Sequence, residues 1–499
     1  MALSPRLAFI ELLPDEVLVT VFSHLKLESP SEVTTSLIVC HVCRRWRLVA
    51  VNYGFLWTPI TPAIGRPELL DTVITRGGSR PMTCIVPIRL GSRTRPIRGI
   101  WEGTLRHSDR IEWLMRHIHR FSALEFCIED AIGSHTGNVL NKDVFNIIDP
   151  GSLAQLESLT AINSMDCDII LPTRLSPNRF IKPGEGLSLL RELCLTNVCF
   201  EGWDVLNVIV NALDGLPLIT KLHLRFTRRG GLLENVTGLS EIISPNKARG
   251  ANIKDLHLAG RTAVATSLFC SLALPSDCDV IVNCIDSTAL NSEQILRLSQ
   301  HISRHFGCTE SRSGEALRLS ESDPEIEARY PKAEVSLAST AGFKFRTISF
   351  ASSALYKGGA DSLFAVSVRA MCNLRLMRVV IDVSLLVGYG NEISNLVGGA
   401  KHLTLRGTMQ AHLAFELEAN SERLVSLVNH PSWETITLKE MDFISDADVA
   451  RHIWASLYAR ILVSGIAVNV RHCRLSEAIM RRVERHGHGR VSWDNNMIE

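Results

Sequence analysis

Residues 13–57 read LPDEVLVTVFSHLKLESPSEVTTSLIVCHVCRRWRLVAVNYGFLW, and their spacing is the most informative in the chain. Leu13 and Pro14 precede an apolar run, and Pro14 suits the first turn of a helix because its missing amide hydrogen would have no partner there. Asp15 and Glu16 place negative charge where the helix dipole is positive. A helix is therefore predicted to begin near residue 14.

The apolar side chains of this segment recur with a helical period in two places. The first set predicts one buried stripe on the first helix, and it comprises Val17, Leu18, Val21, Phe22 and Leu25. A second helical stretch opens near Ser31 and Glu32. Its stripe comprises Leu37, Ile38, Val42, Trp46 and Val49. The periodicity alone fits either one helix or two.

A module of about 45 residues is too short to bury a large core of its own. We expect two tryptophans, Trp46 and Trp57, to stay exposed, together with apolar side chains that the interior does not need. Such a surplus is typical of a surface that docks on another protein. The alternative is that residues 13–57 are simply the first helices of a larger domain.

The ordered set Leu13-Pro14, Val42-Cys43-Arg44-Arg45-Trp46 and Leu56-Trp57 resembles the F-box, the short helical module that docks substrate receptors onto SCF-type ubiquitin ligases. The resemblance implies three helices, the last two separated near Cys40 and His41. It also implies two partners, a Skp-type adaptor and, through it, a cullin. The residues that it implies as adaptor-binding are Leu13, Pro14, Val17, Leu18, Phe22, Leu25, Val42, Cys43, Trp46, Leu56 and Trp57.

The segment after the module predicts a helix over residues 67–76, a turn at Gly77 and Gly78, and a strand over residues 82–88. This layout resembles the link that follows the F-box in a fungal, basidiomycete-type group of F-box-like receptors. Residues 89–99 are basic and rich in turn-forming residues, which predicts an exposed loop. Ser108 and Asp109 then open a further helix.

A degenerate repeat follows, in which three apolar residues recur with the spacing apolar-x-x-apolar-x-apolar. Its copies begin at Phe121, Leu190, Ile219, Ile253, Phe345, Leu376, Ala400 and Trp433. The last three positions of each copy predict a short half-buried strand, and several intervals carry a helical stripe. A strand and a helix in each repeat are typical of leucine-rich repeats, whose parallel strands line one side of the array.

The predicted fold class is therefore α/β, with a small trihelical F-box followed by an irregular leucine-rich-repeat-like solenoid of horseshoe shape. The predicted domains are residues 10–60 for the F-box-like module, 61–120 for a linking strand and helix, and 121–499 for the repeats. A last helical stripe at Leu475, Ile479 and Val483 and a terminal strand over residues 490–494 form the C-terminal cap. A non-solenoid α/β domain is the structural alternative.

Two features depart from the repeat pattern. The ladder asparagine is absent or displaced, since Asn197 stands one place early. The 92 residues between Ile253 and Phe345 contain no clear copy, and three readings stay open for this interval. It holds an irregular repeat, a helical excursion over residues 293–305, or a flexible loop around residues 311–323.

The chain has 499 residues, of which 46% are hydrophobic and 21% charged, with a formal net charge of +1. This balance argues against a general polyanion binder, so nucleic acid is not an expected partner. The start lacks the pattern of a signal peptide, and the uncharged run over residues 262–276 is too short to span a membrane. We expect an intracellular protein, cytoplasmic or nuclear, with reduced thiols.

Metal, redox and catalytic chemistry have little support in the sequence. Residues 40–43 read Cys-His-Val-Cys, and this pair of thiols could share a zinc ion or act in redox chemistry, but no second ligand pair accompanies it. Residues 471–474 and 485–488 concentrate Arg and His, which could bind phosphate or metal but is more typical of solvated charge. Because phosphate-loop, nucleophile-elbow and metalloprotease motifs are absent, we expect no enzyme activity, no cofactor and no metal site.

The function predicted from the sequence is that of a substrate-recognition subunit, which docks through the F-box and holds a protein substrate on the repeats. The alternative is a repeat scaffold that binds proteins without a ligase. On a horseshoe, residues between the inward leucines would face the concave side. The substrate-side positions nominated in this way are His223, Arg225, His257, Arg406, Thr437 and Lys439.

Overall fold

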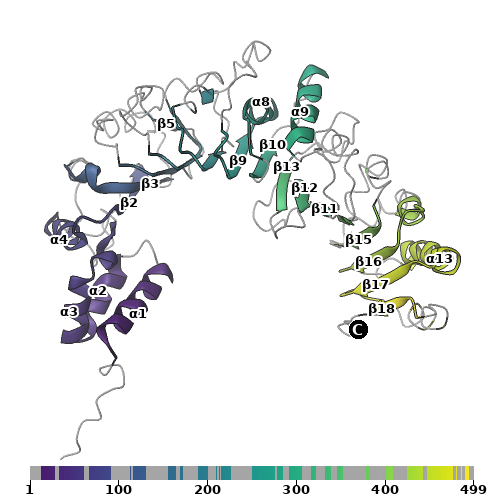
Figure 1. Ribbon diagram of the computed structural model, residues 1–499, viewed down its shortest axis with the longest axis horizontal. Helices are drawn as coiled ribbons and strands as arrows, with labels where there is room; N and C mark the ends of the chain where they lie inside the picture. The colour runs from purple at the N-terminus through teal and green to yellow at the C-terminus, as the bar shows by residue number, and fades with distance from the viewer. Residues whose placement is uncertain are drawn as a thin grey trace, which may run out of the picture. The chain divides into compact units, whose positions relative to one another are not determined.

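The computed structural model describes residues 13–28, 33–60, 67–90, 113, 116–130, 155–163, 169–171, 189–200, 209–210, 213, 215–225, 250–275, 278–284, 292–305, 316–321, 332–338, 345–351, 378–382, 393, 400–407, 424–441, 447–475, 479, 481, 485 and 489–493 (Figure 1). Contacts along the backbone divide the chain into two compact units, Met1–Ile242 and Ile243–Glu499. The predicted domain limits at residues 60 and 120 stay predictions.

Three short α-helices and a 3-10 turn open the first unit (Figure 1). They are α1 (Asp15–Glu28), α2 (Val33–Val42), α3 (Arg44–Asn52) and η2 (Gly54–Trp57). The amides of Val17 and Leu18 both donate to the carbonyl of Pro14 at 3.1 Å, which confirms the predicted helix start. The expected break between the second and third helices lies at Cys43 instead of residues 40–41. Cys43 has extended backbone, and its thiol accepts from the amide of Trp46, so this residue caps α3.

The link after the module has the predicted elements. Helix α4 (Pro67–Gly77) ends in a turn where Gly78 has a φ of +64°, and strand β2 (Met82–Leu90) follows. Strand β1 (Pro59–Ile60) pairs in parallel with β2, so the helical module runs directly into the sheet. Most of the helix predicted after Asp109 lies outside the described residues; Arg116 and His117 are helical, and η4 (Ile118–Arg120) follows them.

A parallel sheet continues from β2 through the first unit. Its further strands are β3 (Phe121–Asp130), β4 (Ser158–Asn163), β6 (Glu192–Thr196) and β8 (Lys221–Arg225). Strands β5 (Ile169–Leu171) and β7 (Val198–Phe200) pair separately as a second parallel sheet. The repeat copies at residues 121, 190 and 219 are thus confirmed as strands.

Neighbouring strands meet residue for residue, which stacks the apolar positions of the repeat. Leu193 of β6 faces Leu222 of β8, and Leu195 faces Leu224, all of them buried. Side chains that alternate with these leucines are only half-buried, as expected for a strand with one face in the core. Strand β4 carries a further copy that its sequence hides, because the third apolar residue of that copy is the small Ala161.

Two asparagines at the ends of β4 and β6 form a buried pair. The Asn163 side-chain amide donates to the Asn197 carbonyl at 3.0 Å, and the Asn197 amide donates to the Asn163 carbonyl at 3.2 Å. Asn197 has a φ of +51°, a left-handed conformation that asparagine tolerates better than most residues. Asn197, which stands one place early in the repeat pattern, is therefore paired with Asn163 at the end of β4.

Replacing Asn163 with Ala is expected to weaken this end of the sheet locally by about 2 kcal/mol, because the carbonyl of Asn197 loses a buried donor. Amide hydrogen exchange of β4 and β6 should become roughly 30-fold faster. Asn429→Ala, at an exposed asparagine of the second unit, is the control and should leave these amides unchanged. Equal exchange in Asn163→Ala and the parent chain would contradict a role for the pair.

The second unit begins with a strand, helix, strand and helix, namely β9 (Asp255–Gly260), α8 (Thr262–Ser271), β10 (Asp279–Cys284) and α9 (Ser292–His305). Strand β9 pairs in parallel with β10 and confirms the copy at residue 253. Helix α8 is buried along most of its length. Among the described residues, no helix is long and apolar enough to cross a membrane. Helix α9 confirms the helical excursion predicted over residues 293–305.

The next three strands pair in antiparallel fashion, whereas the repeat pattern predicts parallel strands. Strands β11 (Ala316–Glu321), β12 (Lys332–Ala338) and β13 (Phe345–Ala351) form consecutive antiparallel pairs. The loop predicted around residues 311–323 is therefore wrong at residues 316–321, where alternating leucines match the apolar residues of β12. The copy at Phe345 is a strand, but its pairing with β12 is antiparallel, unlike that of the other copies.

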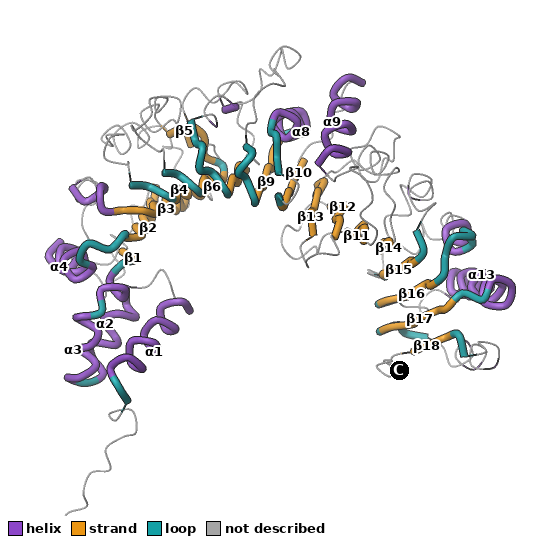
Figure 2. The backbone as a smooth tube through the Cα atoms, in the orientation of Figure 1, coloured by secondary structure: helices purple, strands orange, loops and turns teal. Residues whose placement is uncertain are grey.

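The rest of the second unit returns to parallel strands, which lie side by side in Figure 2. They are β14 (Arg378–Asp382), β15 (His402–Arg406), β16 (Thr435–Lys439), β17 (Ala467–Arg471) and β18 (Val491–Trp493). Helix α13 (Ala447–Ser464) contacts β17 and buries Ile453 and Leu457. The predicted terminal strand is confirmed as β18, and the α/β class is confirmed as well. The horseshoe shape stays a prediction.

Candidate functional site

The core of the N-terminal helical module contains five of the residues nominated for docking. Leu18, Phe22, Trp46, Leu56 and Trp57 are all buried. The rings of Phe22 and Trp46 meet edge to face with centroids 5.1 Å apart. Trp57 donates its indole hydrogen to the carbonyl of Ala50 at 2.8 Å. These contacts join α1, α3 and η2 into one small domain.

The expectation that two tryptophans stay exposed is wrong. Trp46 is 8% exposed and Trp57 is fully enclosed. The guanidinium carbon of Arg76, on α4, lies 4.6 Å from the centre of the Trp57 ring, so the link helix helps to cover it. The indole nitrogen of Trp46 is buried without a hydrogen-bond partner in the described part of the chain. Both indoles therefore support the module in this conformation, and the surface available to a partner lies elsewhere.

That surface consists of apolar side chains for which the module has no core position. Val17 and Val21 of α1 are 40% and 36% exposed, and Ile38 and Val42 of α2 are exposed further still. Each pair is four residues apart and so shares one face of its helix. The predicted single stripes are wrong at these positions, because on α1 Leu18 and Phe22 are buried and Phe22 packs on Trp46, whereas Val17 and Val21 stay partly exposed. Leu48 and Phe55 are further exposed apolar side chains of the module, and Pro14 is exposed as well.

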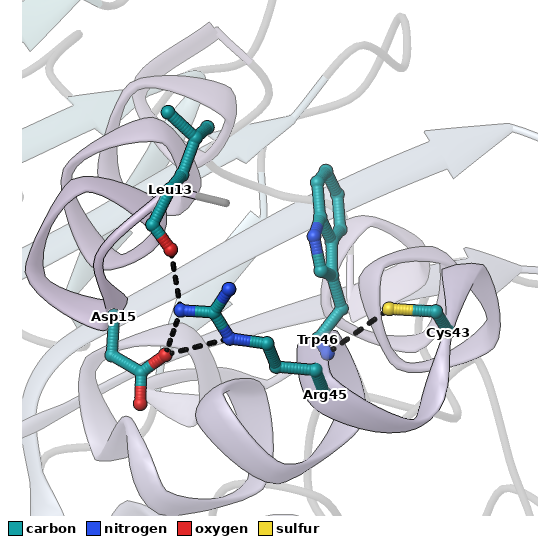
Figure 3. Close-up of polar contacts among 5 residues, drawn as sticks. All are labelled: Leu13, Asp15, Cys43, Arg45 and Trp46. Carbon is teal, nitrogen blue, oxygen red and sulfur yellow. Dashed lines mark hydrogen bonds and ion pairs between the residues drawn. The ribbon is translucent and has the colours of Figure 1, made fainter. Parts of the chain in front are cut away.

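Arg45 holds the start of α1 against α3, as Figure 3 shows. Its Nε and Nη2 atoms donate to the Asp15 carboxylate at 3.0 and 2.7 Å, and Nη2 also donates to the carbonyl of Leu13. The half-buried Leu13 and the exposed Pro14 are thereby kept beside α3. Sequence reasoning missed this role, since no local pattern links residues that are 30 positions apart. The side chain of Leu25, also nominated for docking, lies outside the described residues.

Polar contacts hold the joint between α2 and α3. Arg47 donates to the carbonyl of Cys40 at 2.8 Å, and the Cys43 thiol accepts from the Trp46 amide at 3.4 Å. Burial raises the pKa of the Cys40 thiol, and the nearby Arg76 and Arg47 offset this only in part. No group of three possible metal-ligating side chains occurs among the residues that the structure describes. Within that part of the chain, the two thiols therefore have no third ligand.

The six residues nominated for substrate contact lie at half-buried alternate positions of four strands. The strands are β8 for His223 and Arg225, β9 for His257, β15 for Arg406, and β16 for Thr437 and Lys439. The structure brings Arg406 and Lys439 together, since they are register partners in neighbouring strands. Thr437 accepts a hydrogen bond from Asn469 of β17 at 3.5 Å. Their contact with a substrate stays a prediction.

Comparison with known families finds one match, in which the F-box-like family model covers residues 10–62. The matched residues contain α1 to α3, η2 and β1, the same elements that bury the two tryptophans. A comparison with curated proteins finds no match. The chain thus carries an F-box-like domain. F-box domains bind Skp-type adaptors in SCF complexes, and proteins that carry them are typically non-enzymatic substrate adaptors.

Proposed function

We propose that this chain is a substrate-recognition subunit of an SCF-type ubiquitin ligase, and that it docks on a Skp-type adaptor, and through it on a cullin, by its F-box-like domain. The observation that carries the proposal is the family match over residues 10–62, in a domain that leaves apolar side chains outside its own core. Apolar groups at a protein surface are stabilised when a partner removes them from water. Such a role places the protein inside the cell, in the cytoplasm or the nucleus.

The docking surface that we propose consists of the start of α1 and the exposed apolar residues of α1, α2, α3 and η2. Its members are Leu13, Pro14, Val17, Val21, Ile38, Val42, Leu48 and Phe55. Arg45 contributes indirectly, because its bonds to Asp15 and Leu13 keep the start of α1 in place. The buried residues Leu18, Phe22, Leu56 and the two tryptophans act through the stability of the domain.

We further propose that the strands after the F-box-like domain form a leucine-rich-repeat-like region that holds a protein substrate. Its support is the recurring parallel strand with two buried apolar residues, such as Leu403 and Leu405 in β15 and Ile436 and Leu438 in β16. Stacking such strands in register presents rows of alternate side chains on one face. Rows of this kind offer a partner protein several side chains at fixed spacing.

Capture of a Skp-type adaptor by the full chain tests the docking role. The parent chain is expected to co-purify with the adaptor when the two are co-expressed, and Leu13→Ala combined with Pro14→Ala should weaken capture roughly 10-fold. Leu296→Ala removes an exposed leucine of α9 in the second unit and serves as the matched control. A parent chain that folds but never captures the adaptor would favour a protein-binding scaffold without a ligase.

A further inference from the structure

A row of positive charge lies at the carboxyl ends of three neighbouring strands in the second unit. Arg406, Lys439 and Arg471 are the last residues of β15, β16 and β17, and each is the register partner of the next. All three alternate with buried residues, so they share the face opposite the leucine core. Parallel neighbours lie about 4.8 Å apart, and the row therefore spans roughly 10 Å.

The row continues into the motif at residues 471–474. The Arg474 amide donates to the carbonyl of Met441 at 2.9 Å, which places Arg474 beside the chain that leaves β16. Arg471 and Arg474 are exposed, while Cys473, which lies between them in the sequence, is buried. We define the basic edge as Arg406, Lys439, Arg471 and Arg474. Arg471 of this motif is thus the register partner of Lys439, and the backbone of Arg474 lies beside the end of the neighbouring strand.

Carboxylates compensate this edge only in part. Glu440 accepts from Arg406 at 2.6 Å and lies 3.0 Å from the Lys439 ammonium. Burial alone would raise the pKa of Glu440, but hydrogen bonds from these two cations hold it below its usual value. Asp382 occupies the register position beyond Arg406 on β14. Arg406 and Lys439 thus share the carboxylate of Glu440, and no ion pair of Arg471 occurs among the described residues.

Lys439 and Arg471 are like charges on directly opposed strand positions, and such charges repel each other. The strand ends are nevertheless held close by backbone bonds. The amide of Gly407 donates to the carbonyl of Lys439 at 2.9 Å, and that of Glu440 to the carbonyl of Arg471 at 3.0 Å. The cations therefore cannot separate by moving the strands apart. An incoming anion would relieve the repulsion at a preorganised site.

The neighbouring row on the same face is neutral and rich in hydrogen-bonding groups. It consists of Thr404, Thr437, Asn469 and Ser492, in β15 to β18. Asn469 donates to Thr437, and Ser492 donates to Asn469, so these side chains form a connected series. The row carries no aromatic side chain on which a nucleic-acid base could stack. Hydroxyl and amide groups beside cations instead suit a peptide with carboxylate side chains.

We infer that the basic edge binds an acidic segment of a protein partner, an inference that rests on the proposed role of these strands in holding a substrate. In an extended peptide, side chains on one side recur about every 6.7 Å, so two carboxylates at positions i and i+2 fit the span of the row. Lys439 and Arg471 face these carboxylates, and the row of hydroxyl and amide groups contacts the adjoining peptide. Clustered negative charge on a peptide comes from Asp and Glu or from phosphorylated Ser.

Binding of labelled peptides to the full chain, followed by fluorescence anisotropy, tests the inference. The probes are a twelve-residue peptide of alternating Glu and Ser, its form with phosphorylated Ser, its form with Gln for Glu, and a single strand of twelve thymidines. We expect the Glu peptide to bind, added salt to weaken it, and the Gln peptide not to bind. Tighter binding of the phosphorylated form would make phosphate the preferred source of charge, and equal binding would make carboxylate sufficient; both support the inference.

Variants of the edge locate the binding. Arg471→Gln should weaken binding of the Glu peptide about 5-fold. The triple variant Arg406→Gln, Lys439→Gln and Arg471→Gln should weaken this binding roughly 50-fold. Glu440→Gln removes the competing carboxylate and should strengthen binding about 3-fold. Lys401→Gln is the matched control, since Lys401 precedes β15 at its other end and pairs with Glu434 at 2.7 Å. Its binding should equal that of the parent chain.

Two results would overturn the inference: a triple variant that binds the Glu peptide like the parent chain, or a thymidine strand that binds more tightly than either acidic peptide. Adaptor capture, measured on the same preparations, separates this failure from failure of the proposed function. If the chain captures the adaptor but does not bind the Glu peptide, only the inference of an acidic partner is overturned. If the chain binds the Glu peptide but does not capture the adaptor, only the proposed ligase role is overturned.

Discussion

A chain that carries both Val17→Asp and Val21→Asp is expected to lose capture of a Skp-type adaptor by roughly 100-fold or more. Both side chains lie on one face of α1 and remain partly exposed when the domain is folded. A carboxylate at each position would be covered by the partner without a cation to pair with, and burying an unpaired charge is strongly unfavourable. Co-purification and surface binding to the immobilised adaptor measure the loss.

The domain itself should tolerate this change, because Val17 stands in the first turn of α1, where negative charge is favourable. Unchanged amide hydrogen exchange in α1 and α3 would show that the fold of the domain is intact. The matched control is Leu462→Asp with Val463→Asp, which makes the same kind of change at two exposed apolar residues of α13. Undiminished capture by the Val17 and Val21 variant would place the docking surface elsewhere.

Trp57→Ala should have the largest effect on stability, about 3 to 5 kcal/mol within the F-box-like domain. The substitution empties a fully enclosed site, removes the donor to the Ala50 carbonyl, and removes the ring beneath Arg76. A domain of about 50 residues has little stability to lose, so α3 and η2 should exchange their amide hydrogens almost as unfolded chain. Hydrogen exchange with mass spectrometry localises the loss, and the strands of the second unit should keep their protection.

Two neighbouring variants distinguish a core role from a docking role. Trp57→Phe keeps an aromatic ring under Arg76 and loses one hydrogen bond, so it should cost about 1 to 2 kcal/mol. Phe55→Ala, two residues earlier in η2, removes a 38% exposed side chain and should weaken adaptor capture more than stability. If Trp57→Ala left exchange unchanged, the indole would not be the centre of this small core.

The strands and their buried faces were predictable because their pattern is local. Leu193 with Leu195 and Leu222 with Leu224 alternate with polar residues, and each pair sits in a strand of the expected parallel ladder. The N-terminal helices were predictable for the same reason, with Pro14 and the acidic residues after it marking the start. The break at Cys43 differed from expectation by two or three residues, because an extended Cys that caps a helix leaves no distinct sequence signal.

Which apolar side chains of the module stay exposed could not be derived from periodicity. Val17, Leu18, Val21 and Phe22 form a stripe of which only Leu18 and Phe22 are buried, and the packing of the other helices, with Trp46 against Phe22, decides which half that is. Arg45 and Asp15 meet only once the helices have packed. The partner of Asn197 was hidden because Ala161 weakened the copy that ends in Asn163. Long-range packing, which a single sequence encodes only indirectly, settled all three.

The residue-for-residue register of β14 to β17 also constrains how this protein can change over evolutionary time. Gain or loss of a complete strand with its return segment preserves the spacing of the strands and merely lengthens or shortens the face opposite the core. A one-residue insertion within a strand would instead rotate Leu403 or Ile436 out of the interior and carry Thr404 or Thr437 inward. Duplication of a complete strand with its return segment therefore keeps the register, and short insertions are tolerated best between the strands.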